Sequence, residues 1–512
     1  MRKFLNKANV LAVLSGFFTG IAVLYVVFPL AWISMIPLFV VLNREKNNGT
    51  VWTGALFGAI ASLVTFVPLV SSISTFTGGG LGAGFIVLLI ASAVYALLYG
   101  LVIFVLKQVL RLVTGSPVYR GLAVASSWTL VEFILNIPID GMPWFGGHLG
   151  NGLSGNYYAI QSAEFLGDHG LTFIMVFVNY MFAVAIVPLQ KKQLLVPVLT
   201  IAGWMGAGAI IGLRFGQVME PSQDPFRLAI LSENSPPEIK WDDERGNILV
   251  NQFFGLNRTA VSMNPDMILW SESAIPWTYE VNDDFVSEIR KVSDPRGITQ
   301  LLGINTDYDG VQVYNSLYCL SPGREVDRYD KSRALDFIEK PITGIHLPFF
   351  TENGTIMVEG ENPVPLNTPH GQAGVMICSE SFLWKSAVGM VKEGTEFFVH
   401  PSNDGWYRKT PIVRQHFYAA RLRAVETRKD IAINSNLGIS GLIQASGKIA
   451  KSRRDTKPFV DMVVVTPNRY MTFYANHPYL WIYLISACLL CSVVFGRKQF
   501  KDRIKSKQNS KL

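Results

Sequence analysis

One cysteine lies where a short buried strand is predicted to meet a helix. The apolar run Val375–Ile377 predicts a strand, and residues 379–392 predict a helix that stops at Gly394. A thiol near the unpaired N–H groups of a helix start is favoured as the thiolate, so Cys378 is a candidate nucleophile. The acidic Glu380 follows it closely. A lone cysteine after a strand is also commonly a small buried apolar residue, so the assignment depends on its partners.

Two other side chains complete a set that can transfer acyl groups. Glu272 follows the predicted strand 267–270, and Lys331 lies in a loop that also carries Glu339. Glu272 would take the proton of Cys378, which would attack a carbonyl and hold the acyl group as a thioester. Lys331 and the backbone N–H after Cys378 would face the developing oxyanion. Burial raises the pKa of a glutamate and a nearby lysine lowers it, and the sequence leaves that balance open.

The elements that would position these residues form an α/β pattern. Short apolar runs alternate with polar helical stretches such as 242–258 and 410–428. The runs expected to form strands are 228–231, 267–270, 299–304, 313–320, 375–377, 397–399 and 431–434. We place the catalytic domain at 226–470, which is long enough for one large core.

Long apolar segments precede and follow this domain. The chain is 49% hydrophobic and 16% charged, whereas soluble proteins have about 25% charged residues. Segments of about 17–25 apolar residues can cross a bilayer. About eight segments approach that length: 8–24, 25–42, 51–71, 82–106, 121–136, 166–189, 194–213 and 478–496. We therefore predict a membrane domain of about seven helices at 1–213, a linker at 214–225, a closing membrane helix at 478–496 and a basic tail at 497–512.

The positions of lysine and arginine predict the orientation. Basic residues gather at 2–7, 44–46, 107–120, 191–192 and from 497 onward, and loops 72–81 and 137–165 have none. With about eight spans these basic clusters share one side, which the positive-inside rule makes cytoplasmic. Both termini are then cytoplasmic and the catalytic domain is extracytoplasmic. No A-x-A-like site follows the first span, which argues against a cleaved signal peptide.

Loop 137–165 combines aromatic residues with glycine and proline. Such residues are typical of interfacial anchors, and a re-entrant lid or lipid-entry lip is the functional alternative. Glu132 and Glu164 lie in or next to apolar spans, which makes each a weak functional candidate. His148 alone supports no catalytic role.

The remaining composition excludes several classes. The net charge is +7, but the basic residues are interleaved with acids or border apolar spans, so we expect no nucleic-acid partner. The four cysteines do not form a disulfide framework. No group of residues has the spacing of a metal site, and we expect neither a metal nor a cofactor.

Longer motifs add a resemblance to a known superfamily. After Glu272, Lys331 and Cys378 come Ser402-Asn-Asp-Gly-Trp406, Gln415-His416, Arg423-Ala-Val-Glu426 and Asn436-Leu-Gly-Ile-Ser440. These pieces resemble the nitrilase (carbon–nitrogen hydrolase) superfamily, whose Glu-Lys-Cys triad occurs in this order, and the resemblance covers about 227–468. With the spans and the pieces Trp128 to Glu132, Gly141-Met-Pro-Trp144, 167–179 and Asn234 to Trp241, the whole chain resembles the apolipoprotein N-acyltransferase family.

The resemblance implies a fold and a site. The fold is a nitrilase-like αββα sandwich attached to a multi-span membrane domain. Glu272 is implied as the base, Lys331 as the oxyanion stabiliser and Cys378 as the acylated nucleophile. Supporting or substrate-binding roles are implied for Trp241, Glu339, Ser379 and Glu380. Trp241 could instead pack at an interface, and Glu339 could serve as the salt-bridge partner of Lys331.

The resemblance also implies a reaction. A fatty acyl chain would pass from a phospholipid to Cys378, and then to the α-amine of the N-terminal diacylglyceryl-cysteine of an apolipoprotein. The location would be the bacterial cytoplasmic (inner) membrane, and the enzyme is expected to be a monomer. A membrane-anchored amidase acting on a small C–N substrate is the alternative, and a transporter with an inactive sensing domain is a third.

The chain departs from the family pattern in two motifs. The family usually has Leu-Val-Pro-Phe-Gly-Glu after the lysine, where this chain has Ala334-Leu-Asp-Phe-Ile-Glu339. Asp336 and Ile338 are therefore atypical. Ser379 stands where the family usually has tyrosine. These departures affect the expected recognition of lipid or acceptor rather than the expected chemistry.

Overall fold

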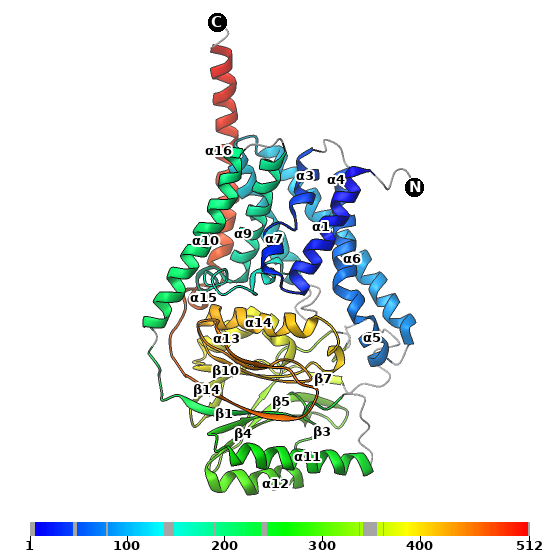
Figure 1. Ribbon diagram of the computed structural model, residues 1–512, viewed down its shortest axis with the longest axis vertical. Coiled ribbons are helices and arrows are strands. Elements are labelled where there is room, and N and C mark those ends of the chain that lie inside the picture. Colours follow the sequence, from blue (N-terminus) through cyan, green and yellow to red (C-terminus); the bar gives the residue numbers. More distant parts are fainter. Residues whose placement is uncertain are drawn as a thin grey trace.

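Apolar helices form one end of the molecule and an α/β domain forms the other (Figure 1). The computed structural model describes residues 6–44, 49–77, 80–137, 148–187, 191–218, 220–236, 243–336, 338–340, 356–361 and 363–509. Among these, six helices are long and apolar enough to cross a membrane, and the apolar stretches Phe28–Arg44 and Leu480–Gly496 are shorter. Each of the predicted spans therefore coincides with an apolar helix or helix pair.

The apolar helices follow the chain order of the predicted spans. They are α1 (Lys7–Leu24), α2 (Phe28–Ala31), α3 (Ile36–Arg44), α4 (Gly49–Phe66), α5 (Val70–Thr77), α6 (Gly80–Leu112), α7 (Pro117–Asn136), α9 (Ala163–Ile186), α10 (Lys191–Val218) and α16 (Leu480–Asn509). The short turns η1 (Val67–Leu69) and η3 (Leu149–Leu153) lie between them.

The second predicted span is two helices rather than one. Pro29 lies in the first turn of α2 and Pro37 in the first turn of α3. Proline is tolerated where a helix begins and interrupts a helix that precedes it, because it lacks the N–H and clashes with the previous turn. The apolar composition of residues 25–42 predicted an apolar helix, and the two prolines divide that segment into α2 and α3.

The α/β domain contains two sheets. The first has the order β14-β1-β2-β4-β5-β6, with β3 beside β4 and β7 beside β5. Its strands are β1 (Phe226–Ser232), β2 (Met267–Leu269), β3 (Ile275–Thr278), β4 (Thr299–Asp307), β5 (Gln312–Leu320), β6 (Asp327–Asp330), β7 (Ile356–Val358) and β14 (Phe459–Val465). The second has the order β13-β12-β11-β10-β9-β8. Its strands are β8 (Leu366–Thr368), β9 (Gly371–Val375), β10 (Phe397–Asn403), β11 (Ile431–Asn436), β12 (Ser440–Ile443) and β13 (Ile449–Arg453).

Helices cover the outer face of each sheet, which gives the αββα layers expected from the resemblance (Figure 1). α11 (Asp243–Ser262) and α12 (Asp284–Ser293) cover the first sheet, far from the membrane helices. α13 (Trp384–Lys392) and α14 (Ile412–Thr427) cover the second sheet and face the membrane helices. Between the sheets the packing is mainly apolar, and Asn434 on β11 donates hydrogen bonds to the carbonyls of Leu231 and Leu269 at 2.6 and 2.8 Å. These bonds join the ends of the strands that precede the candidate site.

Buried ion pairs connect α14 and the turn after it to the membrane helix α9. Arg423 contacts Asp168 at 3.1 Å, and Arg428 contacts Glu164 at 2.8 Å. Breaking such a pair leaves an uncompensated buried charge, so both contacts hold the catalytic domain against the membrane domain. The ion pair with Arg428 gives Glu164 a structural role, which explains why an acidic residue lies next to an apolar span.

Candidate active site

The structure brings together Glu272, Lys331 and Cys378, which lie far apart in the sequence. The Lys331 Nζ atom is 3.4 Å from Glu272 Oε1 and 2.7 Å from Glu339 Oε1. The Cys378 thiol lies close enough to Glu272 for each group to shift the pKa of the other. All three side chains are buried, with exposures of 6%, 1% and 5% in sequence order. A base, a cation and a thiol in contact can carry out acyl transfer.

A tight turn, rather than a long helix, presents the nucleophile. β9 ends at Val375, the 3₁₀ turn η5 covers Cys378–Phe382, and α13 begins only at Trp384. The helix predicted from residue 379 is therefore wrong over its first residues. Cys378 has φ +51°, a left-handed conformation that costs energy for a residue with a Cβ. Tertiary hydrogen bonds must therefore hold the turn.

Glu380 supplies several of those bonds. Its Oε1 atom accepts from the backbone N–H of Ser332 at 2.8 Å, the hydroxyl of Ser332 at 2.6 Å and the hydroxyl of Tyr329 at 2.8 Å. Its Oε2 atom accepts from the backbone N–H of Ile377 at 2.8 Å. Glu380 thus fixes the turn of the nucleophile to the loop that carries Lys331.

Asp404 and His416 hold the same turn from the other side. The His416 Nδ1 atom lies 2.8 Å from Asp404 Oδ1, and its Nε2 atom lies 2.8 Å from the carbonyl oxygen of Cys378. Burial lowers the pKa of His416, but the charge of Asp404 and the hydrogen bonds to Asp404 and to the carbonyl of Cys378 together outweigh burial, and the net shift is upward. Since both ring nitrogens face acceptors, the imidazolium donates to both. The positive ring therefore restrains the backbone of Cys378.

The electrostatics favour a resting thiol. Burial raises the pKa of the Cys378 thiol, and the charge of Glu272 raises it further, against the opposing effect of Lys331. This differs from the thiolate that a helix start predicts, because η5 is a short turn inside a buried site. Burial also raises the pKa of Glu272, and Lys331 only partly offsets this shift. Burial lowers the pKa of Lys331, but Glu339 and Glu272 reverse the shift, so Lys331 remains an ammonium.

The other predicted site residues have different placements. Glu339 is the ion-pair partner of Lys331 and also accepts from the Leu335 N–H at 2.7 Å. Ser379 is buried in η5 beside the nucleophile. Trp241 lies outside the described residues.

Two contacts of the triad were not predicted from the sequence. Asn315 on β5 donates to Glu272 Oε1 at 2.7 Å, and the hydroxyl of Tyr407 lies 3.7 Å from Cys378 Sγ. Asn315 lies in a run predicted as a strand, and nothing in the sequence marks it as a contact of the site. Tyr407 directly follows the Asn-Asp-Gly-Trp block, and its position next to that block was the available indication.

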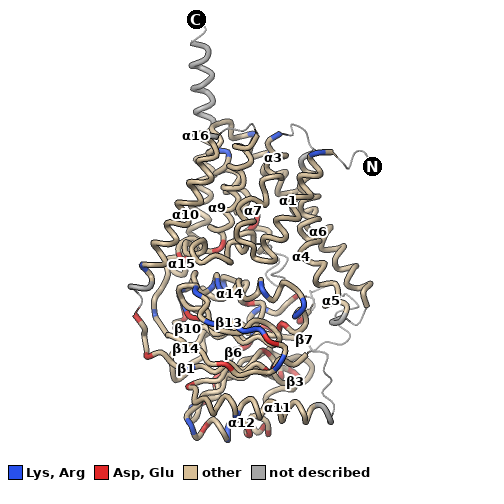
Figure 2. The backbone as a smooth tube through the Cα atoms, viewed as in Figure 1, with Lys and Arg blue, Asp and Glu red and all other residues tan. Residues whose placement is uncertain are grey.

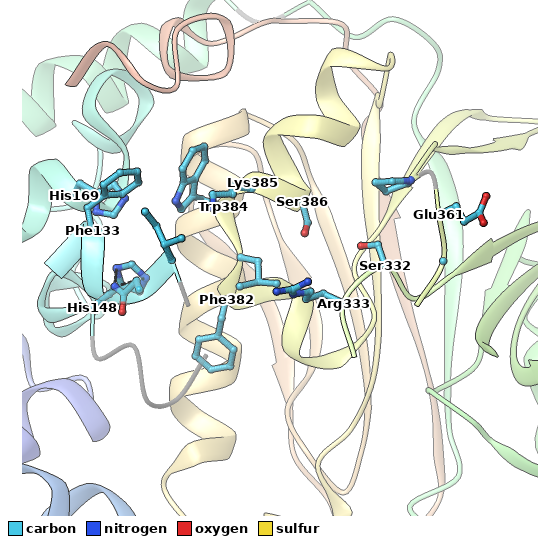
Figure 3. Close-up of a pocket in the computed structure, with 15 residues that line it drawn as sticks. Phe133, His148, His169, Ser332, Arg333, Glu361, Phe382, Trp384, Lys385 and Ser386 are labelled. Atoms are coloured by element: carbon cyan, nitrogen blue, oxygen red, sulfur yellow. Dashed lines mark hydrogen bonds between the residues drawn. The ribbon is translucent and has the colours of Figure 1, made fainter. Parts of the chain in front are cut away.

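A cavity of about 360 Å³ lies beside the site, between the membrane helices and the catalytic domain (Figure 3). Ser332 and Arg333, which follow Lys331, form part of its wall, as do Phe382 and Trp384, which follow the nucleophile. His148 and His169 lie on the opposite, membrane-helix side. The three triad residues are not among its lining residues.

Two family models match the chain. The apolipoprotein N-acyltransferase N-terminal domain matches residues 15–181, and the carbon-nitrogen hydrolase model matches residues 229–458. An apolipoprotein N-acyltransferase of Geobacter metallireducens is 25% identical over 500 residues, covering 92% of this chain and 92% of that protein. One of Thermotoga maritima is 26% identical over 515 residues, covering 95% and 93%. Among solved structures, Nit3 of Saccharomyces cerevisiae, a member of the nitrilase superfamily, is 17% identical with a TM-score of 0.38, covering 48% of this chain and 92% of that one.

Proposed function

We infer what the site does from the premise that this chain belongs to the apolipoprotein N-acyltransferase family and is an acyltransferase with a carbon–nitrogen hydrolase domain. The fatty acyl chain comes from a phospholipid, is held as a thioester on Cys378, and passes to the α-amine of a diacylglyceryl-modified N-terminal cysteine of an apolipoprotein. The observation that carries this proposal is the contact of Glu272, Lys331 and Cys378 in one buried site.

In the first half-reaction Glu272 accepts the proton of the Cys378 thiol as the sulfur attacks the ester carbonyl of the lipid. The oxyanion develops near the ammonium of Lys331, which is fixed by its 2.7 Å contact with Glu339. The tetrahedral intermediate collapses to the thioester, and the leaving lipid oxygen takes the proton from Glu272. The product is a lysophospholipid.

In the second half-reaction a neutral amine attacks the thioester. Glu272 is again a carboxylate and removes a proton from the attacking nitrogen. The C–S bond breaks, the amide forms, and Cys378 regains its proton from Glu272. The raised pKa of Glu272 suits both directions, because a more basic carboxylate accepts a proton more readily and the resulting acid can still return it.

An apolar contact between the site and a membrane helix supports a lipid donor. Tyr407, whose hydroxyl lies 3.7 Å from Cys378 Sγ, packs in one apolar cluster with Leu24 at the end of α1. An apolar groove of about 710 Å³ lies between α1 and α4, and Leu69 of the adjacent η1 turn packs against the same cluster. A chain that stays in such surroundings avoids about 0.8 kcal/mol per CH₂ exposed to water, or more than about 10 kcal/mol for a C16 chain.

The charge distribution supports the orientation. Figure 2 shows lysine and arginine at the ends of membrane helices that lie away from the catalytic domain. The positive-inside rule assigns such ends to the cytoplasm, which supports cytoplasmic termini and a periplasmic catalytic domain. Lipoprotein acceptors and outer-leaflet phospholipids then reach the site from the same side. We expect the enzyme to act as a monomer, since all triad residues come from one chain.

The test is the mass of the intact protein after incubation with one defined phospholipid, followed by a diacylated lipopeptide. We expect one acyl adduct, sensitive to hydroxylamine, that disappears when the lipopeptide is added and becomes an amide on the peptide. Cys378→Ala should lose the adduct. Cys319→Ala is the matched control, because Cys319 is a second buried cysteine of the same domain and should leave acylation intact. An adduct that persists in Cys378→Ala would remove Cys378 from this role, and lipid-independent release of ammonia from small amides would indicate the amidase instead.

A further inference from the structure

A second group of chemically active side chains lies on the membrane-helix side of the cavity. Glu132 comes from α7, His148 precedes η3, and His169 comes from α9. One ligand atom of each lies within 4.8 Å of the others, and Glu132 Oε1 is 3.5 Å from His148 Nδ1. Figure 3 shows the two histidines side by side on one wall. No role in the acyl-transfer cycle above uses this group.

His169 carries the strongest indication that a ligand is missing. Its ring is 1% exposed, and neither ring nitrogen has a hydrogen-bond partner within the part of the chain that the structure describes. The ring lies 4.1 Å from the indole of Trp481 and 5.5 Å from the ring of Phe133, centroid to centroid. These aromatic contacts fix the orientation of the imidazole but satisfy neither nitrogen. The carboxylate of Asp168 is near, but its Oδ1 atom lies 3.6 Å from Nε2, which is too far for a hydrogen bond. Buried polar groups are almost always paired, so a partner for His169 is required.

The charged side chains near the histidines indicate whether the missing ligand is a cation or an anion. Arg423 is shared by two carboxylates, Asp168 at 3.1 Å and Glu426 at 2.9 Å. Glu132, 7% exposed, has its only ion contact among the described residues with the His148 ring, which is cationic only when protonated. With neutral histidines, the carboxylates outnumber the guanidinium in this buried region. An unbalanced buried carboxylate is costly, and a cation between Glu132 and the histidines would balance it.

We propose that Glu132, His148 and His169 bind one divalent transition-metal cation, with Zn²⁺ as the best match. Two imidazoles and a carboxylate are a common zinc donor set. Tetrahedral bonds of about 2.0–2.1 Å place neighbouring donors roughly 3.3 Å apart. Glu132 and His148 are almost in place at 3.5 Å, and His169, whose ligand atom is within 4.8 Å of theirs, would move closer by at most about 1.5 Å. The fourth position faces the cavity that His148 and His169 line.

The surroundings of Glu132 are already arranged for this role. Thr172 Oγ1 donates to Glu132 Oε1 at 2.9 Å, and the Leu149 N–H donates to Oε2 at 3.4 Å. Such hydrogen bonds orient a ligating carboxylate and strengthen its binding of a metal. The ion would join α7 to α9 and to the residue before η3, at the wall of the cavity beside the active site. None of the triad residues belongs to the group, so the ion takes no part in the proposed acyl transfer at Cys378.

The test is metal binding by the full-length protein in detergent after removal of metals with a chelator. We expect one equivalent of Zn²⁺ by elemental analysis, and visible absorption bands of a low-symmetry site when Co²⁺ is added. His148→Gln and His169→Gln should each weaken Zn²⁺ binding by more than about 100-fold, the upper range for losing only a hydrogen-bonded neighbour of a ligand. His370→Gln, a histidine of the catalytic domain that is not in the group, is the matched control and should bind as the unmodified protein does.

Thermal unfolding gives a second readout. Zn²⁺ should raise the unfolding temperature of the unmodified protein and of His370→Gln, but not of His148→Gln or His169→Gln. Lack of bound Zn²⁺ and of Co²⁺ bands in the unmodified protein would overturn the proposal, even where a variant fails to fold. Equal affinity in the folded His148→Gln and His169→Gln variants would overturn it as well. Acylation of Cys378 is scored separately, so failure of the metal site does not affect the proposed reaction.

Discussion

Replacing Glu380 by glutamine tests whether the position of the nucleophile depends on one buried carboxylate. Glu380 is 0% exposed, and both of its oxygens accept hydrogen bonds. Glutamine has one oxygen and one NH₂ group. If the oxygen faces the donors of Ser332 and Tyr329, the NH₂ group faces the N–H of Ile377, and two donors oppose each other. In the other orientation the NH₂ group faces the donors of Ser332 and Tyr329, so more donors oppose each other and the cost is higher.

The lower-cost orientation leaves the N–H of Ile377 unpaired next to the nucleophile. A buried donor without a partner costs about 1–3 kcal/mol. If that cost falls on holding Cys378 in its left-handed conformation beside Lys331, acylation slows by about 5- to 160-fold, since each 1.36 kcal/mol is a factor of ten. The protein should remain folded, because the glutamine has nearly the volume of the glutamate.

The assay is single-turnover acylation of Cys378 by a defined phospholipid, followed by intact mass. Ser332→Ala is the control, since it removes one hydroxyl donor from Glu380 and leaves the bond to Ile377 in place. We expect the loss in Ser332→Ala to be clearly smaller than in Glu380→Gln. An unchanged acylation rate in folded Glu380→Gln would refute the reasoning that Glu380 positions the nucleophile.

Three further changes test other parts of the structure. Lys331→Met should slow acylation by about 100- to 1,000-fold, the usual cost of losing an oxyanion donor, while lipid binding changes little, as measured by kcat against KM. Glu339→Gln removes an anion that raises the pKa of Glu272. The acidic limb of the pH profile of acylation, along which the rate rises as Glu272 ionises, should therefore move to lower pH. An unmoved limb would assign that ionisation to another group. Arg428→Met leaves Glu164 buried without its partner and should lower the free energy of unfolding by about 3–5 kcal/mol, measured by denaturation in detergent, and Arg428→Met combined with Glu164→Gln should recover part of that loss.

The linear motifs pointed to three residues that the structure brings together, but they did not predict the geometry of the group. Glu272, Lys331 and Cys378 each follow an apolar run, and strand ends on facing sheets meet at one edge, so their proximity is predictable. The turn at Cys378 is not. Helical periodicity from 379 onward predicts one helix, but the structure has a left-handed residue and a short 3₁₀ turn there. Hydrogen bonds to segments far along the chain hold this turn, because Glu380 inside it binds Ser332 and Tyr329, and His416 binds the carbonyl of Cys378.

Long-range contacts explain the other differences. Asn315 sits in a strand whose sequence gives no sign that one amide will reach Glu272. Glu132, His148 and His169 have no ligand spacing along the chain, because α7, the segment before η3 and α9 meet only in the fold. The second predicted span differs, because the residues that divide it into two helices can be recognised in the sequence. Its two prolines are in the sequence, and they decide where the helices begin.

The burial of Cys378 has two consequences that act together in the proposed cycle. At 5% exposure the thiol has a raised pKa, so the sulfur becomes nucleophilic only when Glu272 takes its proton beside a bound carbonyl. The same burial keeps water from the thioester while the enzyme waits for an amine. A site with an exposed, ionised cysteine would react faster with soluble esters but would lose its acyl group to water. Because the proposed acceptor is a large lipidated peptide, the proposed cycle depends more on a long-lived thioester than on a reactive resting thiol. The apolar contact of Tyr407 with Leu24 would help to exclude water from the thioester.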